Sequence, residues 1–490
     1  MNFNAEDTAC FADDKPKEEC GVFGVYRNTR GNVATDCYFG LYALQHRGQE
    51  SCGIVVNNDG VFKYKKGMGL VGDVFKQPEL SALGSGKIAL GHVRYSTTGL
   101  STPHNTQPLV IRHMKGPMAV SHNGNLVNAV QLRKTYESRG GIFHSTSDTE
   151  AIAYAITQER LVRNSIEEAV ESALPGLHGA FCLVVMSAQK LIAARDPHGF
   201  HPLCIGELPG SSHGYVFSSE SCALSAIGAK FVRDVLPGEI VIADDTGLRS
   251  ITTHCPGSGT KSSVCVFEFI YFARPDSVIE GASVHRARRR AGKFLAQTHP
   301  VDADIVIGVP DSGIDAALGY SKESGIPYGI GFIKNRYIGR TFIQPTQNLR
   351  EASVKIKLNV IADTVKDKRV IMIDDSIVRG TTTGVIVKLL REAGAREVHV
   401  RISAPPFMHP CYFGTDIDSR DKLIACRLTV PEIAKELGAD SLGYLELSHA
   451  PLLAKGAGCG FCDGCFSGRY PLEVPAEMPK DKFESQIRRG

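Results

Sequence analysis

Residues 370–383 read VIMIDDSIVRGTTT, and this stretch decides the fold of the second half of the chain. An apolar run ends in the adjacent carboxylates Asp374 and Asp375, and a glycine and three threonines follow before a helical pattern. The carboxyl end of a parallel strand is the edge on which open α/β sheets bind ligands. Adjacent carboxylates there can accept hydrogen bonds from a ribose diol or hold Mg²⁺ through water. The N–H groups of residues 380–383, at the start of a helix, favour a phosphate.

The bland alternative is that these carboxylates and threonines are ordinary loop and capping residues. A P-loop is excluded because the chain contains no GxxxxGK[ST]. Residues 309–313, VPDSG, form a second strand-to-helix turn of the same kind, in which Ser312 offers a hydroxyl ligand. Taken alone, this turn is equally compatible with a helix cap and with a second phosphate site.

The segments around these turns alternate between buried-strand and helical patterns. Such alternation is typical of a parallel sheet covered by helices. Strands are expected at 304–309, 328–333, 369–373 and 397–403, and helices at 314–323 and 383–393.

This half, from about residue 265 to 447, resembles the type I phosphoribosyltransferases, which bind 5-phosphoribosyl 1-pyrophosphate. The resemblance implies that Asp374 and Asp375 bind the ribose and Mg²⁺, and that Ser312 joins the metal. It assigns the 5-phosphate to Gly380, Thr381, Thr382 and Thr383. It assigns the pyrophosphate to the 309–313 turn, with Pro310, Asp311 and Gly313.

The first half, from Cys20 to about residue 251, consists of short alternating segments separated by Gly, Asn, Asp and Pro turns. Two helical stretches, 147–161 and 165–173, interrupt them. This pattern predicts stacked antiparallel sheets with helices outside. Residues 254–263, HCPGSGTKSS, have the composition of a linker between the two halves.

Cys20 stands at the head of a strand-like run, where a cysteine by itself usually indicates core packing. Four polar stretches change this interpretation: LQHRGQESC (44–52), GHVRYSTTG (91–99), VSHNGNL (120–126) and HSTSDTE (144–150). Together with Cys20 they resemble the glutaminase domain of the N-terminal-nucleophile amidotransferases. The resemblance implies a four-layer αββα sandwich whose cysteine becomes the first residue of the mature chain, which makes residues 1–19 a propeptide.

The resemblance also assigns roles around Cys20. Arg94 clamps the glutamine α-carboxylate, Asp148 takes the α-amino group, and Asn123 and Gly124 supply oxyanion donors. An α-amine titrates near pH 8, about two units below lysine, so part of it is neutral and can act as a base beside the thiol. Singly, Arg94 could be a surface ion pair, residues 123–124 a hairpin turn and Asp148 a helix cap.

Three cysteines near the end of the chain form CGFCDGC, namely Cys459, Cys462 and Cys465. This density indicates a metal or redox centre with a further ligand from afar, either Cys265 or Cys411. CDGCFSGRYP, CVFEFIYFARPDS and HPCYFG resemble the iron–sulfur class of amidophosphoribosyltransferases. The resemblance implies a [4Fe-4S] cluster on Cys265, Cys411, Cys462 and Cys465. Cys459 leaves the ligand pair open, and zinc in a Cys₄ site is the alternative.

Composition sets the remaining limits. The chain has 490 residues, 43% hydrophobic and 22% charged, which is typical of two or three folded domains. A net charge of +3 is too even to indicate a nucleic-acid-binding surface. No apolar run is long enough to cross a membrane, and the first 19 residues lack the features of a signal or transit peptide. We therefore expect a cytoplasmic protein whose 14 cysteines are reduced.

The predicted fold is α+β and α/β. Its parts are a propeptide (1–19), a glutaminase domain (20–252), a linker (253–263), a phosphoribosyltransferase domain (264–450) and a cysteine-containing C-terminal segment that packs on the cluster (451–490). The predicted activity converts phosphoribosyl pyrophosphate, glutamine and water to 5-phosphoribosylamine, glutamate and pyrophosphate, the first committed step of purine synthesis. By resemblance we expect a homotetramer inhibited by purine nucleotides. The alternatives are an iron–sulfur, nucleotide-responsive regulator and a salvage phosphoribosyltransferase, neither of which needs a glutaminase.

Overall fold

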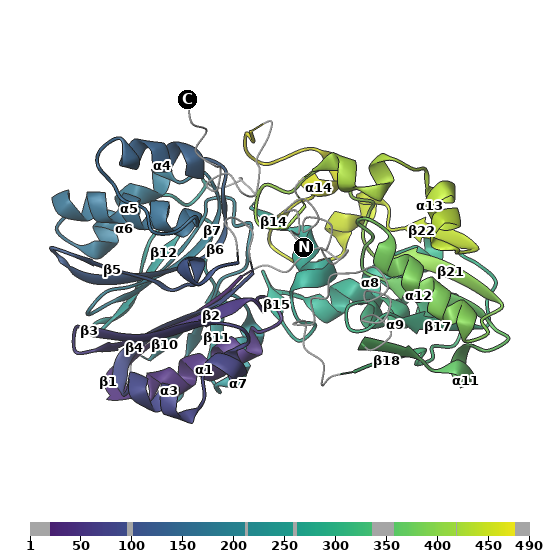
Figure 1. The fold of residues 1–490 in the computed structure, drawn as a ribbon, viewed down its shortest axis with the longest axis horizontal. Coiled ribbons are helices and arrows are strands. Elements are labelled where there is room, and N and C mark those ends of the chain that lie inside the picture. Colours follow the sequence, from purple (N-terminus) through teal and green to yellow (C-terminus); the bar gives the residue numbers. More distant parts are fainter. Residues whose placement is uncertain are drawn as a thin grey trace, which may run out of the picture.

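The computed structural model describes residues 20–95, 101–210, 214–257, 262–335, 357–417 and 419–475. Its first part contains two antiparallel sheets (Figure 1). The first sheet has the order β11 (Lys230–Asp234), β9 (Cys204–Glu207), β10 (Tyr215–Ser218), β1 (Gly21–Gly31), β4 (Gly86–Arg94), β2 (Ser51–Asn58), β3 (Val61–Met68). The second has the order β13 (Gly247–Ile251), β12 (Ile240–Asp244), β8 (Leu191–Arg195), β7 (Gly179–Met186), β6 (Gly116–Leu126), β5 (Leu109–His113).

Helices cover the outer face of each sheet, as Figure 1 shows. The first sheet packs against α1 (Val33–Ala43), α2 (Val71–Val74), α3 (Gln77–Leu83) and α7 (Ser221–Ala226). The second packs against α4 (Ala129–Glu137), α5 (Asp148–Val162) and α6 (Ile166–Ala173). A separate apolar core lies between the sheets and includes Val55, Leu90 and Val184, all fully buried. The predicted four-layer αββα sandwich is confirmed.

Both predicted helical stretches are present, as α5 and α6, and the described residues of this part contain further helices that the sequence pattern did not predict. The two predicted helices, α5 and α6, begin at serine caps: the Ser147 hydroxyl accepts from Thr149 N and the Ser165 hydroxyl from Glu168 N. Neither α1 nor α4 has a capping side chain. In addition, α1 is apolar on most of its surface, so its sequence lacks the polar stripe that reveals a helix.

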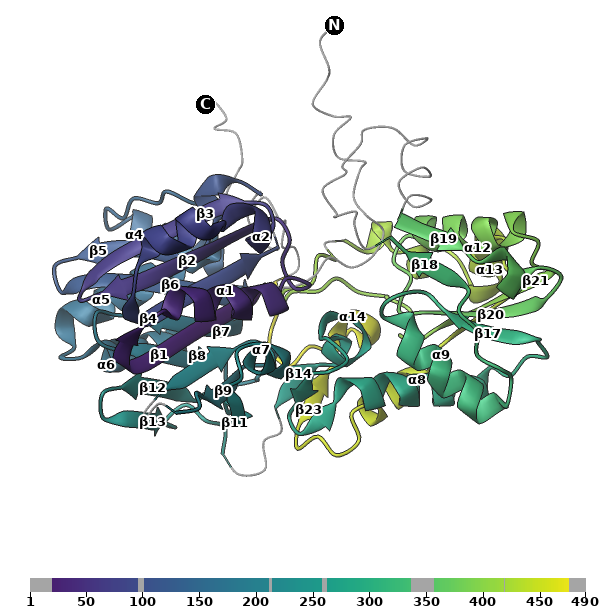
Figure 2. The same cartoon turned by 90° about the horizontal axis from the view of Figure 1, so that it is seen from below.

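The second part contains a parallel sheet with the order β17 (Ile305–Gly308), β20 (Arg369–Asp374), β21 (Glu397–Ile402), β22 (Ser441–Tyr444). Figure 2 shows α12 (Thr381–Glu392) and α13 (Val430–Leu437) on one face, and α8 (Val284–Thr298) and α9 (Gly313–Ser324) on the other. The expected parallel sheet covered by helices is confirmed. The strand expected at 328–333 is reduced to a bridge between Val306 and Tyr328, followed by β18 (Phe332–Lys334), which pairs with β19 (Leu358–Val360).

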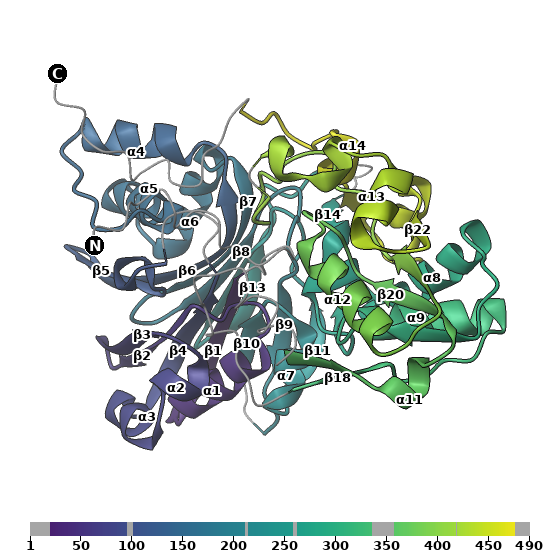
Figure 3. The same ribbon diagram turned by 45° about the vertical axis from the view of Figure 1, so that its right-hand side comes forward.

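A small sheet joins the beginning and the end of the second part. β14 (Ser263–Cys265) pairs in parallel with β23 (Gly460–Cys462), so the C-terminal segment returns to the point where this part begins. Figures 2 and 3 show β14 and α14 (Gly464–Ser467) at the junction of the two parts. The remaining short elements are η2 (Pro103–Asn105), η3 (Leu174–Gly176), η4 (Glu268–Phe272), β15 (Val278–Ile279), β16 (Ala282–Ser283), α11 (Ala362–Val365), η5 (Arg420–Lys422), η6 (Ile424–Cys426) and η7 (Leu447–Leu452).

Several of the expected regions fall wholly or partly outside the described residues. These are the propeptide, 1–19, positions 96–99 of the stretch 91–99, positions 258–261 of the linker and positions 476–490 of the C-terminal segment. Among the helices that the structure describes, none has the length and apolar character needed to cross a bilayer.

The close crossing of α8 and α9 yields a stability prediction. A Cβ at Gly292 would collide with the carbonyl oxygen of Ala316. Gly292→Ala should therefore lower stability by about 1–3 kcal/mol, because the helices must move apart. Gly384 lies on α12 with only Leu437 nearby, so Gly384→Ala should be neutral or stabilising by about 0.5–1 kcal/mol. Thermal unfolding of both variants checks this, and equal behaviour would contradict the prediction.

Candidate functional site

Cys20 lies at the entry to β1, where pairing with β4 brings it close to Arg94. The register places Gly21 opposite Val93, so the residues that flank this pair are neighbours. The Cys20 thiol donates to the carbonyl oxygen of Tyr95 at 3.3 Å. Burial raises the pKa of Cys20 to about 11, the positive charge of Arg94 opposes this rise, and the carboxylates of Glu50 and Asp148 add to it. The charges of Arg94 and Asp148 thus both influence the Cys20 thiol, which is expected if the three residues belong to one site.

Asn123 and Gly124 are consecutive residues of β6. The side-chain nitrogen Nδ2 of Asn123 is buried and has no hydrogen-bond partner among the residues that the structure describes. An unpaired buried donor costs about 1–3 kcal/mol, so it is typical of a site that awaits an acceptor. Gly124 has φ +138°, and a Cβ there would collide with the carbonyl oxygen of Ala180. Only glycine fits this position, which fixes the backbone beside the Asn123 amide.

Asp148 is the first residue of α5 and is held against the end of β6. Its Oδ2 accepts from Leu126 N at 3.0 Å, and its Oδ1 lies 3.3 Å from His122 Nδ1. His122 and Leu126 flank the Asn123–Gly124 pair on the same strand. The carboxylate is thus anchored next to the candidate oxyanion donors. A thiol, an amide donor, a guanidinium and a carboxylate form a set that suits an amino acid carrying a reactive carbonyl.

The second candidate site lies at the carboxyl ends of β17 and β20. Gly308 pairs with Ile373, and Val309 N donates to the Ile373 carbonyl at 2.9 Å, so the turns that follow the two strands meet. The carboxylates of Asp374 and Asp375 are fully buried there. The Ser312 hydroxyl donates to Asp375 Oδ2. The structure therefore brings together the three residues expected to hold Mg²⁺.

The start of α12 completes this edge. Gly380 is the N-cap with φ +91°, and a Cβ there would lie 2.8 Å from the Ile424 side chain. Thr381, Thr382 and Thr383 are the first three residues of α12 and so lie at its positive end. In the opposite turn, Asp311 points outward, with its side chain 72% exposed, and pairs with Lys334. The peptide bond between Pro310 and Asp311 is cis.

Four of the cysteines singled out above lie close to one another. Cys265 pairs with Cys462 across β14 and β23. Burial raises the pKa of Cys465 well above its ordinary value, and Cys411 and Cys462 add to the rise. Cys411 Sγ accepts from Phe413 N at 3.5 Å. Within the described residues, no group of three or more His, Cys, Asp and Glu side chains is placed to hold one metal ion.

Cys459 has different neighbours. Burial raises its pKa to about 12, and the charges that act on it are those of Glu280, Arg195 and Asp234, not those of the other cysteines. Its position thus separates it from the set of Cys265, Cys411, Cys462 and Cys465.

Comparison with known proteins agrees with this geometry. Residues 92–226 match the model of a family described as glutamine amidotransferase domain. An amidophosphoribosyltransferase of Synechocystis is 51% identical over 472 residues, which cover 96% of this chain and 94% of that protein. The chain belongs to the amidophosphoribosyltransferase family.

Two solved structures are similar to this amidophosphoribosyltransferase over nearly its whole length. One is described as glutamine phosphoribosylpyrophosphate (PRPP) amidotransferase from B. subtilis complexed with ADP and GMP. It is 45% identical in sequence and has a TM-score of 0.86, and the match covers 95% of this chain and 100% of that one. The other is described as the allosteric regulatory enzyme of purine biosynthesis; it is 45% identical with a TM-score of 0.87, covering 96% and 99%.

Sequence reasoning missed the residues that support Cys20 from behind. Arg47, Glu220 and Glu268 form a buried ionic group, and Arg47 Nε donates to the Cys20 carbonyl at 3.1 Å. Arg47 lies within the quoted stretch LQHRGQESC, so the sequence did point to one of the three residues of this buried ionic group. Nothing in the sequence pattern links it to the two glutamates.

The high pKa of Cys20 yields a prediction for chains in which residue 19 is still attached. With a pKa of about 11, the reactive thiolate is scarce at pH 7, and its fraction rises about tenfold per pH unit until pH nears the pKa. Alkylation of Cys20 by iodoacetamide, followed by peptide mass mapping between pH 7 and 10, should show that slope. A rate that levels off below pH 9 would contradict it.

Proposed function

We propose that Cys20 is the nucleophile of a glutamine-dependent amidophosphoribosyltransferase. The enzyme converts phosphoribosyl pyrophosphate, glutamine and water to 5-phosphoribosylamine, glutamate and pyrophosphate, in the first committed step of purine synthesis. The observation that carries the assignment is the partnerless Asn123 amide nitrogen in a buried site whose thiol is acted on by Arg94 and Asp148. Neither a nucleotide-responsive regulator nor a salvage phosphoribosyltransferase needs such a set.

The glutaminase step follows from the chemistry of these groups. Cleavage of the Glu19–Cys20 bond frees an α-amine, which is partly neutral near pH 8 and takes the thiol proton. Arg94 binds the glutamine α-carboxylate through its two-pronged guanidinium, and Asp148 accepts from the α-amino group. As the sulfur attacks, negative charge develops on the amide oxygen and is stabilised by Asn123 Nδ2 and the Gly124 N–H. Ammonia leaves, and water hydrolyses the thioester to glutamate.

The transfer step uses the edge of the parallel sheet. Asp374 and Asp375 accept hydrogen bonds from the ribose hydroxyls, while the N–H groups and hydroxyls of residues 380–383 hold the 5-phosphate at the helix N-terminus. The turn containing Pro310, Asp311 and Gly313 holds the pyrophosphate. Ammonia attacks C1 of the ribose, the C1–oxygen bond breaks, and pyrophosphate leaves with the electron pair.

The oxygen-rich set of Ser312, Asp374 and Asp375 suits Mg²⁺, which prefers carboxylate and hydroxyl oxygens and retains several waters. The Ser312–Asp375 hydrogen bond supports this fit, because it holds the hydroxyl beside the carboxylate. When bound, the metal would neutralise charge on the leaving pyrophosphate. The protein's own part is to keep both carboxylates in place at the end of β20.

We assign a [4Fe-4S] cluster to Cys265, Cys411, Cys462 and Cys465. The fit rests on the pairing of Cys265 with Cys462 and on the mutual influence of Cys411, Cys462 and Cys465. A single zinc ion would need four sulfurs within about 2.3 Å of one point. Each iron of a cluster takes one thiolate, which lets the sulfurs stand farther apart. Such a group would fasten β14 to the C-terminal segment.

Regulation and assembly complete the proposal. The B. subtilis relative is described with ADP and GMP, which supports feedback inhibition of this chain by purine nucleotides. A homotetramer, a cytoplasmic location, a propeptide 1–19 and the domain boundaries at 252, 264 and 450 remain predictions.

The central test separates the two half-reactions. Cys20→Ala should abolish glutamine-dependent turnover, because no other group forms the thioester, while ammonia-dependent synthesis stays measurable. Pyrophosphate release with each nitrogen source measures both. Retention of glutamine-dependent turnover would refute the assignment of Cys20, and loss of both activities in a folded chain would count against separate sites.

A matched pair of cysteines tests the cluster. Cys462→Ser should lower iron and sulfide content and the visible absorption of anaerobically purified protein, whereas Cys459→Ser should leave them unchanged, because Cys459 has other neighbours. Metal analysis of both variants distinguishes the outcomes. Bound zinc without sulfide would favour the Cys₄ alternative, and equal loss in both variants would show that the ligand set is wrong.

A further inference from the structure

Arg47 is a fully buried arginine directly behind the candidate nucleophile. Its Nε donates to the Cys20 carbonyl at 3.1 Å. Its Nη1 lies 2.7 Å from Glu220 Oε1, and its Nη2 lies 2.7 Å from Glu268 Oε1. All three charged side chains have no exposed surface. The guanidinium thus binds the Cys20 carbonyl through Nε and the two carboxylates through its terminal nitrogens, and Nη1 also lies 3.0 Å from Glu268 Oε2.

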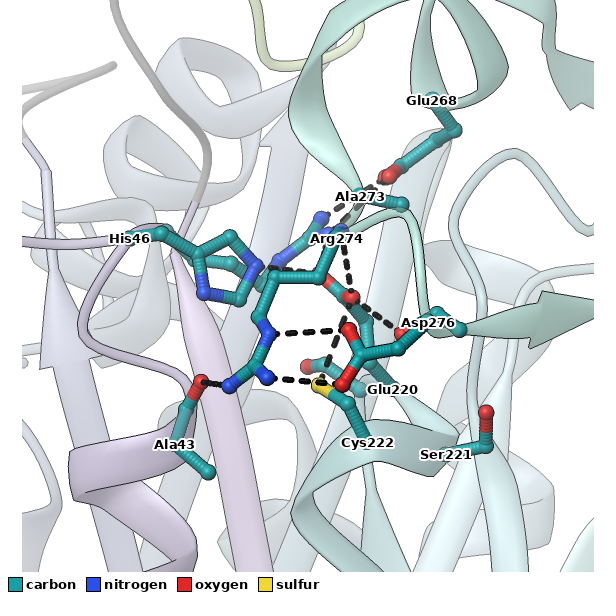
Figure 4. Close-up of polar contacts among 12 residues, drawn as sticks. Ala43, His46, Glu220, Ser221, Cys222, Glu268, Ala273, Arg274 and Asp276 are labelled. Atoms are coloured by element: carbon teal, nitrogen blue, oxygen red, sulfur yellow. Dashed lines mark hydrogen bonds and ion pairs between the residues drawn. The ribbon is translucent and has the colours of Figure 1, made fainter. Parts of the chain in front are cut away.

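The two carboxylates come from different halves of the molecule. Glu220 lies between β10 and α7 in the first half. Glu268 begins η4, three residues after Cys265, in the second half. Figure 4 shows the region in which Glu220, Glu268, His46 and Arg274 gather. The contact between Arg47 and Glu268 is therefore a tie between the glutaminase half and the phosphoribosyl half.

Further hydrogen bonds fix each carboxylate. Glu220 Oε2 accepts from Arg274 N at 2.9 Å and from the Ser277 hydroxyl at 2.6 Å, and Glu220 Oε1 lies 2.7 Å from His46 Nε2. Figure 4 labels Glu220, His46 and Arg274 and draws the polar contacts within this cluster as dashed lines.

Glu268 has a second partner across the junction, His201 of the first half. His201 Nδ1 lies 3.5 Å from Glu268 Oε1, and His201 Nε2 is 2.7 Å from the Phe413 carbonyl. Burial works to raise the pKa of both glutamates, but Arg47 together with the neighbouring histidines outweighs it and holds both values below their usual range. Both carboxylates are thus ionised at neutral pH and can orient the guanidinium.

We propose that Arg47 is a positioning residue for the Cys20 nucleophile and that Glu268, from the other half of the molecule, holds Arg47 in place. This inference rests on the proposed function of Cys20. As the first residue of the mature chain, Cys20 would have no preceding residue to restrain it, and chain ends fray unless they are tied down. The Arg47 guanidinium restrains its carbonyl. Glutamine cleavage would then depend on a residue that touches neither glutamine nor phosphoribosyl pyrophosphate.

Glu268→Gln tests the dependence with little change of shape. It removes one of the two negative charges that orient Arg47. A displacement of the reacting atom by about 1 Å can cost up to about 100-fold in rate. We expect kcat for glutamine-dependent turnover to fall about tenfold or more, KM for glutamine to change less than about twofold, and ammonia-dependent kcat to stay the same. Glu268→Asp, which keeps the charge, should recover part of the lost kcat.

Glu280→Gln is the matched control. Glu280 also joins the halves through a buried arginine, since its Oε1 lies 2.6 Å from Arg195 Nη1. Arg195, however, donates to the backbone carbonyls of Gly199, His201 and Val235 and not to that of Cys20. This variant should leave glutamine-dependent kcat within about twofold of the parent. An equal loss in both variants would show that the effect is general loosening of the junction, and would overturn the proposal.

The remaining outcomes are equally decisive. Unchanged glutamine-dependent kcat in Glu268→Gln would overturn the positioning role and leave the assignment of Cys20 intact. Ammonia-dependent activity in the same preparation reports whether the second half is folded, so a misfolded variant is recognised. Cys20→Ala tests the nucleophile itself, so failure of that assignment is measured separately. Recovery by Glu268→Asp distinguishes loss of charge from loss of packing.

Discussion

The buried ion pair between Arg47 and Glu268 is the interaction on which the relation between the two halves depends. A charge enclosed by protein is tolerated only with a well-placed partner, and removing one partner from such a pair costs about 3–5 kcal/mol. Arg47 donates to Glu220 in its own half through Nη1, and to Glu268 in the other half through both Nη1 and Nη2. Each half therefore needs the other to pair all of its buried charges at the junction. The arginine that forms this contact also donates to the carbonyl of Cys20, the candidate nucleophile.

The fold was predictable from the sequence where the local residue pattern reports the burial or the capping of an element. The strand Arg369–Asp374 is buried on both faces, so it appears in the sequence as an unbroken apolar run. Helices with capping serines were equally evident. By contrast, Val33–Ala43 lacks both a capping side chain and a polar stripe, and β18 is three residues long with a partner across residues 336–356. Such elements are decided by tertiary contacts.

The candidate sites, too, were predictable where their residues are adjacent in sequence and not where tertiary contacts bring distant residues together. Asp374, Asp375 and the 380–383 turn are adjacent in sequence, so their chemistry was visible as a motif, and Ser312 joined them through the pairing of neighbouring strands. The Asn123–Gly124 pair was recognisable by resemblance, although only the structure reveals that the amide lacks a partner. The support of Cys20 could not be predicted, because Arg47 reaches partners 173 and 221 residues away.

The pairing of β14 with β23 has a consequence for biosynthesis. The first half can assemble as soon as it leaves the ribosome, whereas Glu268 is made 221 residues after Arg47. At 5–20 residues per second this interval is roughly 10–45 s. The small sheet beside Glu268 must wait for Gly460–Cys462, which are made long after Ser263–Cys265. A nascent chain thus carries a folded first half without its partners at the junction until these residues emerge, and chaperones can bind it during that interval.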